Sequence, residues 1–297
     1  MERTLVVVTC YRDLKPLHIM FRSIKKYLEP ANIVIIVNEC DDMKWLTWYD
    51  RNSHLLNNHH VKIIYRKDLI ATELHKYSPS LDGWILQNIL KLIVSTIVNT
   101  DEYILLDSKN FFIRPTQLQD INRRAGTNVF NEIGWDIGWI SAVTSRLSTP
   151  LTSLISPDCE ILLSSAETPY IINTSYARQL VEHFGGIHIF VRWFLTVSEN
   201  LFACRVVTPP EDNRHIFVSE FYLYELFCSL ELNVKYDDGI KTNSWVLWNK
   251  RYGRVPEWPI DQIPESIYVG GIHRDYIHES SKTEIDNIYR HFGLDEV

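Results

Sequence analysis

The chain begins with short apolar runs that alternate with amphipathic stretches. Four runs rich in β-branched and aliphatic residues predict buried strands at 4–10, 32–39, 61–69 and 102–107. Apolar residues recur at helical spacing in a stretch that begins near Pro16 and in the segment 83–100, and both are predicted to be helices. The polar segment 41–60 between the second and third runs predicts a short helix or a surface excursion. This alternation predicts right-handed crossovers and an α/β fold with a mostly parallel central sheet flanked by helices.

The second half of the chain is less regular. Strand-like pieces are predicted at 128–133, 159–165, 168–173, 203–208 and 234–236. Helices are predicted at 174–184, 219–231 and 281–292. The last of these opens with Ser281 and Glu284 in capping-box spacing and ends at Gly293. Because no repeat, linker or charge run divides the sequence, we expect residues 1–297 to form a single compact unit.

Composition and charge exclude several classes of function. The formal net charge is −7, and no cluster of Lys and Arg forms a surface for a phosphate backbone, so we expect no nucleic-acid partner. Five scattered cysteines without a Cys-x-x-Cys pair suit neither a disulfide framework nor a zinc site, and they indicate a reducing compartment. No apolar run is long enough for a signal peptide or a membrane span, so we expect a cytoplasmic protein.

The ends of the predicted strands are the first candidates for a site, because ligands of parallel sheets bind beyond the carboxyl ends of the strands. Asp107 ends the fourth apolar run, in the stretch LLDSKNFF. A carboxylate in this position can coordinate a divalent cation or hold a ribose hydroxyl. It can equally be a turn residue that accepts a hydrogen bond from its own backbone. The position alone leaves both interpretations open.

Three further polar groups have both a functional and a structural interpretation. Gln87 and Lys91 share one stripe of the helix 83–100, which is typical of a site wall or of a solvated face. Glu220 begins a predicted helix, where an acidic residue serves the helix dipole or acts as a general base in a cleft. His273 follows a pair of glycines in a segment that we expect to be a loop, and it is a structural residue or a metal ligand.

Six motifs in order along the chain resemble those of a known class of enzymes. They read VVVTCYRD, GWILQNILKL, YILLDSKNFFIRP, TPYIINTSYARQLV, SEFYLYELF and GGIHRD. This order resembles the GT-A class of nucleotide-sugar glycosyltransferases, and in detail its small bacterial and viral branches, from about residue 5 to residue 273. The resemblance implies a GT-A fold with a nucleotide-binding half (1–115) and an acceptor-binding half (116–297) that includes the carboxyl-terminal helix.

The implied activity is the transfer of a hexosyl or N-acetylhexosaminyl group from a nucleotide sugar, with a UDP-sugar favoured, to a hydroxyl of a glycan or another acceptor. Glu220 resembles the acidic residue that inverting members use as the catalytic base. The alternative is a catalytically weakened GT-A-fold protein that only binds a sugar nucleotide or a glycan.

The resemblance departs from the family at its metal motif. Members usually carry Asp-x-Asp where this chain has Asp107, Ser108 and Lys109, so the first aspartate matches and the second, the principal metal ligand, does not. His273 lies where many members place a further metal ligand. Either Asp107 and His273 hold Mn²⁺ or Mg²⁺ with Lys109 turned away, or the ammonium of Lys109 takes the place of the metal beside the leaving diphosphate.

The remaining candidate residues follow from the same resemblance. Nucleotide contacts are expected from Thr9, Tyr11, Arg12, Glu39, Gln87, Lys91, Asp107, Ser108 and Lys109. The acceptor side is expected to include Trp135, Asp136 and Trp193, because the faces of tryptophan rings suit stacking on sugars. Packing in the core is the alternative, and we expect it for at least half of these tryptophans.

Overall fold

The structure is a computed structural model, and it describes residues 1–38, 42–70, 83–128, 143–147, 151–154, 158–164, 167–207, 219–236, 239–240, 243–247, 258–273, 276–277 and 280–295. Its central sheet has the strand order β3-β2-β1-β4-β8. The strands are β1 (Arg3–Thr9), β2 (Asn32–Val37), β3 (His60–Tyr65), β4 (Glu102–Asp107) and β8 (Tyr170–Asn173). The first four run parallel, and β8 pairs antiparallel with β4. The predicted α/β unit with a mostly parallel sheet is therefore confirmed.

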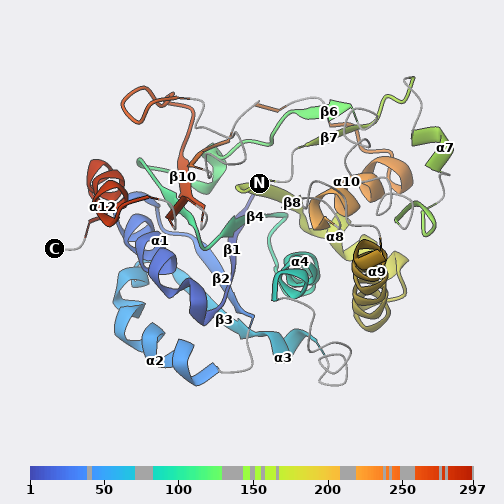
Figure 1. Cartoon of the computed structure of the whole chain (residues 1–297), viewed down its shortest axis with the longest axis horizontal. Coiled ribbons are helices and arrows are strands. Elements are labelled where there is room, and N and C mark those ends of the chain that lie inside the picture. Colours follow the sequence, from blue (N-terminus) through green and yellow to red (C-terminus); the bar gives the residue numbers. More distant parts are fainter. Residues whose placement is uncertain are drawn as a thin grey trace.

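Helices cover both faces of this sheet (Figure 1). One face packs against α1 (Leu14–Tyr27) and α2 (Asp42–Asn52). The other packs against α4 (Gly83–Ile93), α8 (Thr174–His183), α9 (Ile187–Val207) and α10 (Glu220–Glu231). Alternate residues of β1 enter the two cores, so both faces must be apolar, and this explains the continuous apolar runs of the central strands.

Several predicted boundaries shift in the first half of the chain. The strand expected at 61–69 ends at Tyr65, and Arg66–Leu69 forms the short helix α3. The backbone N–H of Tyr65 donates to Asp68 at 3.0 Å, a cap that the sequence analysis did not include. The polar segment 41–60 holds the helix α2, and the helix expected at 83–100 ends at Ile93 before a 3-10 turn, η4 (Val94–Thr96).

Two predicted strands are wrong. Residues 203–207 belong to the long helix α9, and residues 234–236 form no strand. The periodicity of α9 is hidden because apolar residues occur on all sides of the helix rather than on one stripe. Its β-branched and aromatic residues then suit a strand as well as a helix.

A second sheet has the order β5-β10-β9, and its strands are β5 (Asn110–Phe112), β9 (Ser244–Leu247) and β10 (Val269–Ile272). The glycine pair expected in a loop therefore lies in the central strand of this sheet. A Cβ at Gly270 would lie 2.9 Å from Ile113 Cγ2 and 3.0 Å from the Phe111 ring, so only glycine lets the strands approach this closely. The helix α12 (Lys282–His291) packs on Phe111 through Tyr289, and Phe292, which follows the helix, packs on the same ring.

The remaining short elements lie at the ends and edges of these layers. They are β6 (Gly126–Asn128) and β7 (Leu162–Ser164), which form a two-stranded sheet, the helix α7 (Leu151–Leu154), and the 3-10 turns η1 (Tyr11–Asp13), η2 (Ser53–Leu56) and η5 (Leu118–Asp120). The predicted caps of α12 are confirmed, because the Ser281 side chain accepts from the N–H of Glu284 at 3.1 Å and Gly293 has a φ of 61°. In the described part of the chain, no helix is long and apolar enough to cross a membrane.

The close approach of β10 to its neighbours gives a first prediction. Gly270→Ala should lower the free energy of unfolding by about 1–3 kcal/mol, because the added methyl overpacks the contact with Ile113 and Phe111. Gly83→Ala is the matched control, since its added methyl meets its nearest neighbour at 3.9 Å. Urea unfolding followed by circular dichroism measures both variants. Equal stability of the two would show that β10 does not pack as described.

Candidate active site at the ends of β1 and β4

The site lies where the central sheet changes direction. From β1 the chain builds outward through β2 and β3, and it then returns to the other side of β1 with β4. Val8 pairs with Asp107, so the carboxyl ends of these two strands lie side by side. In open α/β sheets this switch point is where ligands bind. The position of Asp107 at the switch point therefore favours a ligand-binding role over the role of a turn residue.

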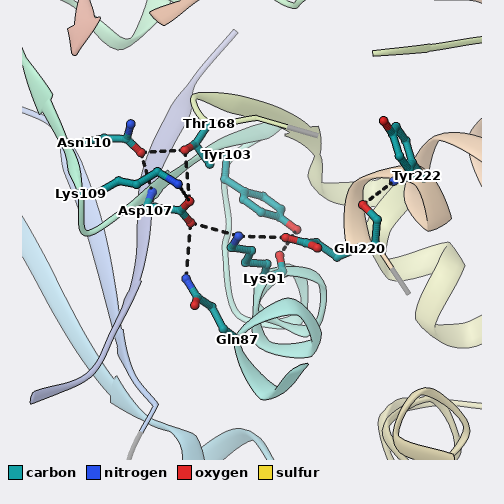
Figure 2. Close-up of polar contacts among 10 residues, drawn as sticks. Gln87, Lys91, Tyr103, Asp107, Lys109, Asn110, Thr168, Glu220 and Tyr222 are labelled. Carbon is teal, nitrogen blue, oxygen red and sulfur yellow. Dashed lines mark hydrogen bonds and ion pairs between the residues drawn. The ribbon is translucent and has the colours of Figure 1, made fainter. Parts of the chain in front are cut away.

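Asp107 is surrounded by nitrogen donors from three directions (Figure 2). Its Oδ2 lies 2.9 Å from Lys109 Nζ, and its Oδ1 lies 3.1 Å from Lys91 Nζ. Gln87 Nε2 donates to Oδ1 at 3.4 Å, and the backbone N–H of Asp107 donates to Asn110 Oδ1 at 2.9 Å. Burial alone raises the pKa of Asp107, but Lys109 and Lys91 outweigh burial and hold this pKa well below its ordinary value. The carboxylate therefore stays ionised at neutral pH.

Lys91 joins the two carboxylates of the site. Its Nζ lies 2.8 Å from Glu220 Oε1 as well as 3.1 Å from Asp107 Oδ1, and its side chain is 5% exposed. Burial alone lowers the pKa of Lys91, but Asp107 and Glu220 outweigh burial and raise it. The ring of Phe221 lies 4.9 Å from the same ammonium, and the Tyr103 hydroxyl donates to the Lys91 carbonyl oxygen at 2.9 Å. A permanent buried cation thus ties α4 to β4 and α10.

His273 comes close to this site through the second sheet. The N–H of Ile272 donates to the carbonyl oxygen of Lys109 at 3.3 Å, and the N–H of His273 donates to that of Leu247 at 2.9 Å. Residues 269–272 therefore run beside residues 109–112, although the two segments are far apart in the sequence. The metal-binding role of His273 stays a prediction.

The donor set around Asp107 does not fit a divalent cation. Mn²⁺ and Mg²⁺ need several oxygen or imidazole ligands, and both Asp107 oxygens already accept from ammonium groups that would repel the ion. Within the described ranges, no group of three or more His, Cys, Asp or Glu side chains could hold a metal ion. No step of the chemistry is therefore assigned to a metal.

Residues 4–236 match the profile of a family of unknown function, DUF6492. The chain belongs to DUF6492. None of the curated proteins compared with it matches.

Solved structures that resemble this DUF6492 member include glycosyltransferases at low identity. An active-site mutant of LgtC has 11% identity and a TM-score of 0.46, over 98% of this chain and 94% of LgtC. The bifunctional WbbM has 12% identity and a TM-score of 0.42, over 98% of this chain and 51% of WbbM. GlyE from Streptococcus pneumoniae TIGR4 has 13% identity and a TM-score of 0.29, over 42% of this chain and 29% of GlyE. The DUF6492 chain thus spans about half of WbbM and less than a third of GlyE, and likeness of this degree does not bear on activity.

The predicted nucleotide-binding residues near β1 take different positions in the DUF6492 structure. Thr9 is buried at the end of β1, whereas Tyr11 and Arg12 are exposed in the following turn η1. Ser108 is buried between Asp107 and Lys109. An exposed aromatic ring and an arginine beside the switch point suit contact with a nucleotide, and this role stays a prediction.

The predicted acceptor residues are mostly outside the described structure. Trp135 and Asp136, and also Glu39, which is a predicted nucleotide contact, lie outside the described residues. Trp193 is 8% exposed, and its ring packs against Phe184 with centroids 4.4 Å apart. The structure therefore favours the core interpretation for Trp193.

Sequence reasoning missed polar groups that complete the site. The Thr168 hydroxyl donates to Asn110 Oδ1 at 2.7 Å and lies 3.4 Å from Asp107 Oδ2 (Figure 2). At the ends of β2 and β3, Arg66 Nη1 donates to Asn38 Oδ1 at 3.3 Å. Thr168 begins the motif TPYIINTSYARQLV but was assigned no role, because only the antiparallel pairing of β8 with β4 shows that it reaches this edge.

A second buried polar cluster lies five residues further along α10, at Glu225. Glu225 is fully buried, and its carboxylate accepts hydrogen bonds from the Ser164 N–H, the Ser164 hydroxyl and the Tyr170 hydroxyl. Burial raises the pKa of Glu225 to about 7, although these bonds and the charge of Arg123 oppose the rise. The Tyr170 ring stacks on Phe221 with centroids 4.0 Å apart. Because Phe221 also lies beside Lys91, this cluster supports the wall of the site.

Proposed function

We propose that this DUF6492 member transfers a sugar from a nucleoside diphosphate sugar, with a UDP-sugar favoured, to a hydroxyl of a glycan or another acceptor. The observation that carries the proposal is the carboxylate of Asp107, whose side chain is 20% exposed, between the ammonium groups of Lys91 and Lys109 at the switch point of the sheet. A carboxylate accepts hydrogen bonds from ribose hydroxyls, and an ammonium complements a diphosphate. The motif order that resembles the GT-A class supports the same function, with residues 1–115 as the nucleotide-binding half and 116–297 as the acceptor-binding half.

The reaction breaks the bond between the anomeric carbon and the diphosphate oxygen and forms a bond from that carbon to the acceptor oxygen. The diphosphate leaves with the bonding electron pair, so its negative charge grows in the transition state. Lys109 is the cation that we assign to this charge, because its ammonium is more exposed than that of Lys91. The proton of the acceptor hydroxyl passes to a general base.

Glu220 remains the proposed base, and its contacts add a second role. Its Oε1 accepts from Lys91 at 2.8 Å, and its side chain is 4% exposed. These contacts give Glu220 the role of positioning Lys91. The role of base needs one thing more, namely that the Glu220 carboxylate reaches the acceptor hydroxyl. NMR of the product linkage distinguishes the roles, because a base at Glu220 predicts inversion at the anomeric carbon.

The proposed function predicts release of free nucleoside diphosphate from a matching nucleotide sugar. A panel of UDP-, GDP- and ADP-sugars, read by coupled detection of the released diphosphate, should give turnover with at least one donor. Asp107→Asn should lower that turnover at least tenfold, because the variant loses the charge that orients Lys91 and Lys109. Asp50→Asn, which changes an exposed carboxylate on α2, should retain it.

A binding protein without turnover is the second candidate function. It is favoured by one observation, namely that Asp107 and Glu220 both face ammonium groups inside the protein, as in a purely structural network. Tight binding of a nucleotide sugar with no release of diphosphate, with or without acceptors, would identify this function. Turnover that depends on Asp107 would exclude it.

A further inference from the structure

We propose that the ammonium of Lys109 replaces the divalent cation at this site, so that a nucleoside diphosphate binds without any metal ion. The inference rests on the proposed function, because it concerns how the same site holds the diphosphate of its donor. It goes beyond that function by stating that the diphosphate binds at this site in the absence of any metal ion.

Charge balance is the first support. In an Asp-x-Asp motif with a bound divalent cation, two carboxylates and the ion sum to −2 + 2 = 0. Here Asp107 and Lys109 sum to −1 + 1 = 0. Replacing the second aspartate by lysine changes the charge by +2, which is the charge of the ion. The diphosphate therefore meets the same net charge in both arrangements.

Geometry is the second support. Lys109 Nζ lies 2.9 Å from Asp107 Oδ2, on the carboxylate that a metal would need. The Lys109 side chain is 24% exposed and that of Lys91 is 5% exposed, so Lys109 is the more accessible of the two ammonium groups on Asp107. An ammonium has three N–H donors and can hold a carboxylate and a phosphate oxygen together. Lys109 is thus placed to bridge Asp107 and the diphosphate.

The backbone around Lys109 is the third support, because it fixes where the side chain begins. The carbonyl oxygen of Lys109 accepts from the N–H of Ile272, and β5 follows directly at Asn110. Asn110 is fully buried, accepts from the Asp107 N–H and from Thr168, and would lie 3.0 Å from a Cβ at Gly271. The backbone that follows Lys109 is therefore held in place without a metal to organise the turn, and the ion pair with Asp107 at 2.9 Å orients the ammonium.

Titration calorimetry with UDP, GDP and ADP as probes tests the inference directly. The wild-type protein should bind at least one of them in EDTA, and adding Mn²⁺ should change the dissociation constant by no more than about twofold. Lys109→Met should weaken this binding at least tenfold, because it removes the charge and keeps a side chain of similar length. Lys62→Met, at an exposed position of β3, is the matched control and should bind as the wild type does.

Lys109→Asp provides the converse experiment. It restores the Asp-x-Asp motif, and its binding of the same diphosphate should require Mn²⁺. Circular dichroism verifies that each variant is folded. If Lys109→Asp does not fold, the Lys109→Met experiment still tests the inference. If the wild type binds a diphosphate only with Mn²⁺, the inference is wrong and the proposed function stands. If no diphosphate binds with or without Mn²⁺, both are wrong.

Discussion

Lys91→Met should lower the free energy of unfolding by about 3–5 kcal/mol, which is the usual cost of removing one partner from a buried ion pair. Methionine fills a similar volume, so the packing beside Phe221 is retained while the charge is lost. Glu220 is then left as a buried carboxylate that has lost its Lys91 partner. Asp107 suffers less, because Lys109 still neutralises it.

Guanidinium unfolding at pH 7 measures this loss, and a second variant separates charge from packing. The double variant Lys91→Met with Glu220→Gln should recover most of the lost stability, because Glu220 no longer leaves an unpaired buried charge and Asp107 still has Lys109 as its partner. Glu220→Gln alone should cost less than Lys91→Met, since Lys91 keeps Asp107 as a partner. A loss below about 1 kcal/mol for Lys91→Met would contradict the buried geometry of the pair.

Stability should fall by about 3 kcal/mol as the pH rises from about 4.5 to above 7, through the titration of Glu225. Its pKa rises from 4.5 to about 7 on folding, a difference of about 2.5 units at 1.36 kcal/mol each. Between these values the folded protein holds a proton that the unfolded chain has lost. The stability contributed by the protonated form is therefore complete below pH 4.5 and is lost as the pH rises through 7.

The contribution of Glu225 is isolated by comparing urea unfolding of the wild type and of Glu225→Gln at pH 5 and pH 8. The glutamine keeps an acceptor for Ser164 and Tyr170 and has no charge to bury. The loss of unfolding free energy between pH 5 and pH 8 should therefore be about 3 kcal/mol smaller in the variant than in the wild type. Glu160→Gln, at an exposed position, is the matched control and should keep the wild-type difference. The same pH difference in Glu225→Gln and the wild type would show that another group titrates.

The central strands could be predicted from the sequence because both faces of each strand are buried. β4 matches the predicted range 102–107 in full, and β1 and β2 match within two residues at each end. The same rule failed for residues 203–207, because α9 also has apolar residues on all sides and a local pattern cannot distinguish the two cases. The glycine pair in β10 was expected in a loop. The reason for glycine there is the close contact with Phe111, which is distant in the sequence and therefore leaves no local pattern.

The site could be predicted as far as each residue carried a local signal. Asp107 was identifiable because it ends a buried strand, and Lys91 because it shares a polar stripe of α4 with Gln87. The pairing of Lys91 with Glu220 spans 129 positions of the sequence, so no spacing rule could reveal it. Glu225 lies inside an apolar helix opposite residues of β7 and β8, and only the packed structure shows that its charge is buried.

The pairing of β10 with β5 has a consequence for how the protein is made. Synthesis proceeds from the amino terminus, and early segments can fold while later ones are still being added. Until residues 269–272 have left the ribosome, β5 presents an unpaired edge beside Lys109 and the apolar Phe111 lacks its cover. Exposed strand edges promote association between chains. A nascent or truncated chain that ends before β10 should therefore associate more readily than the whole chain, and the edge beside Lys109 should mature late in synthesis.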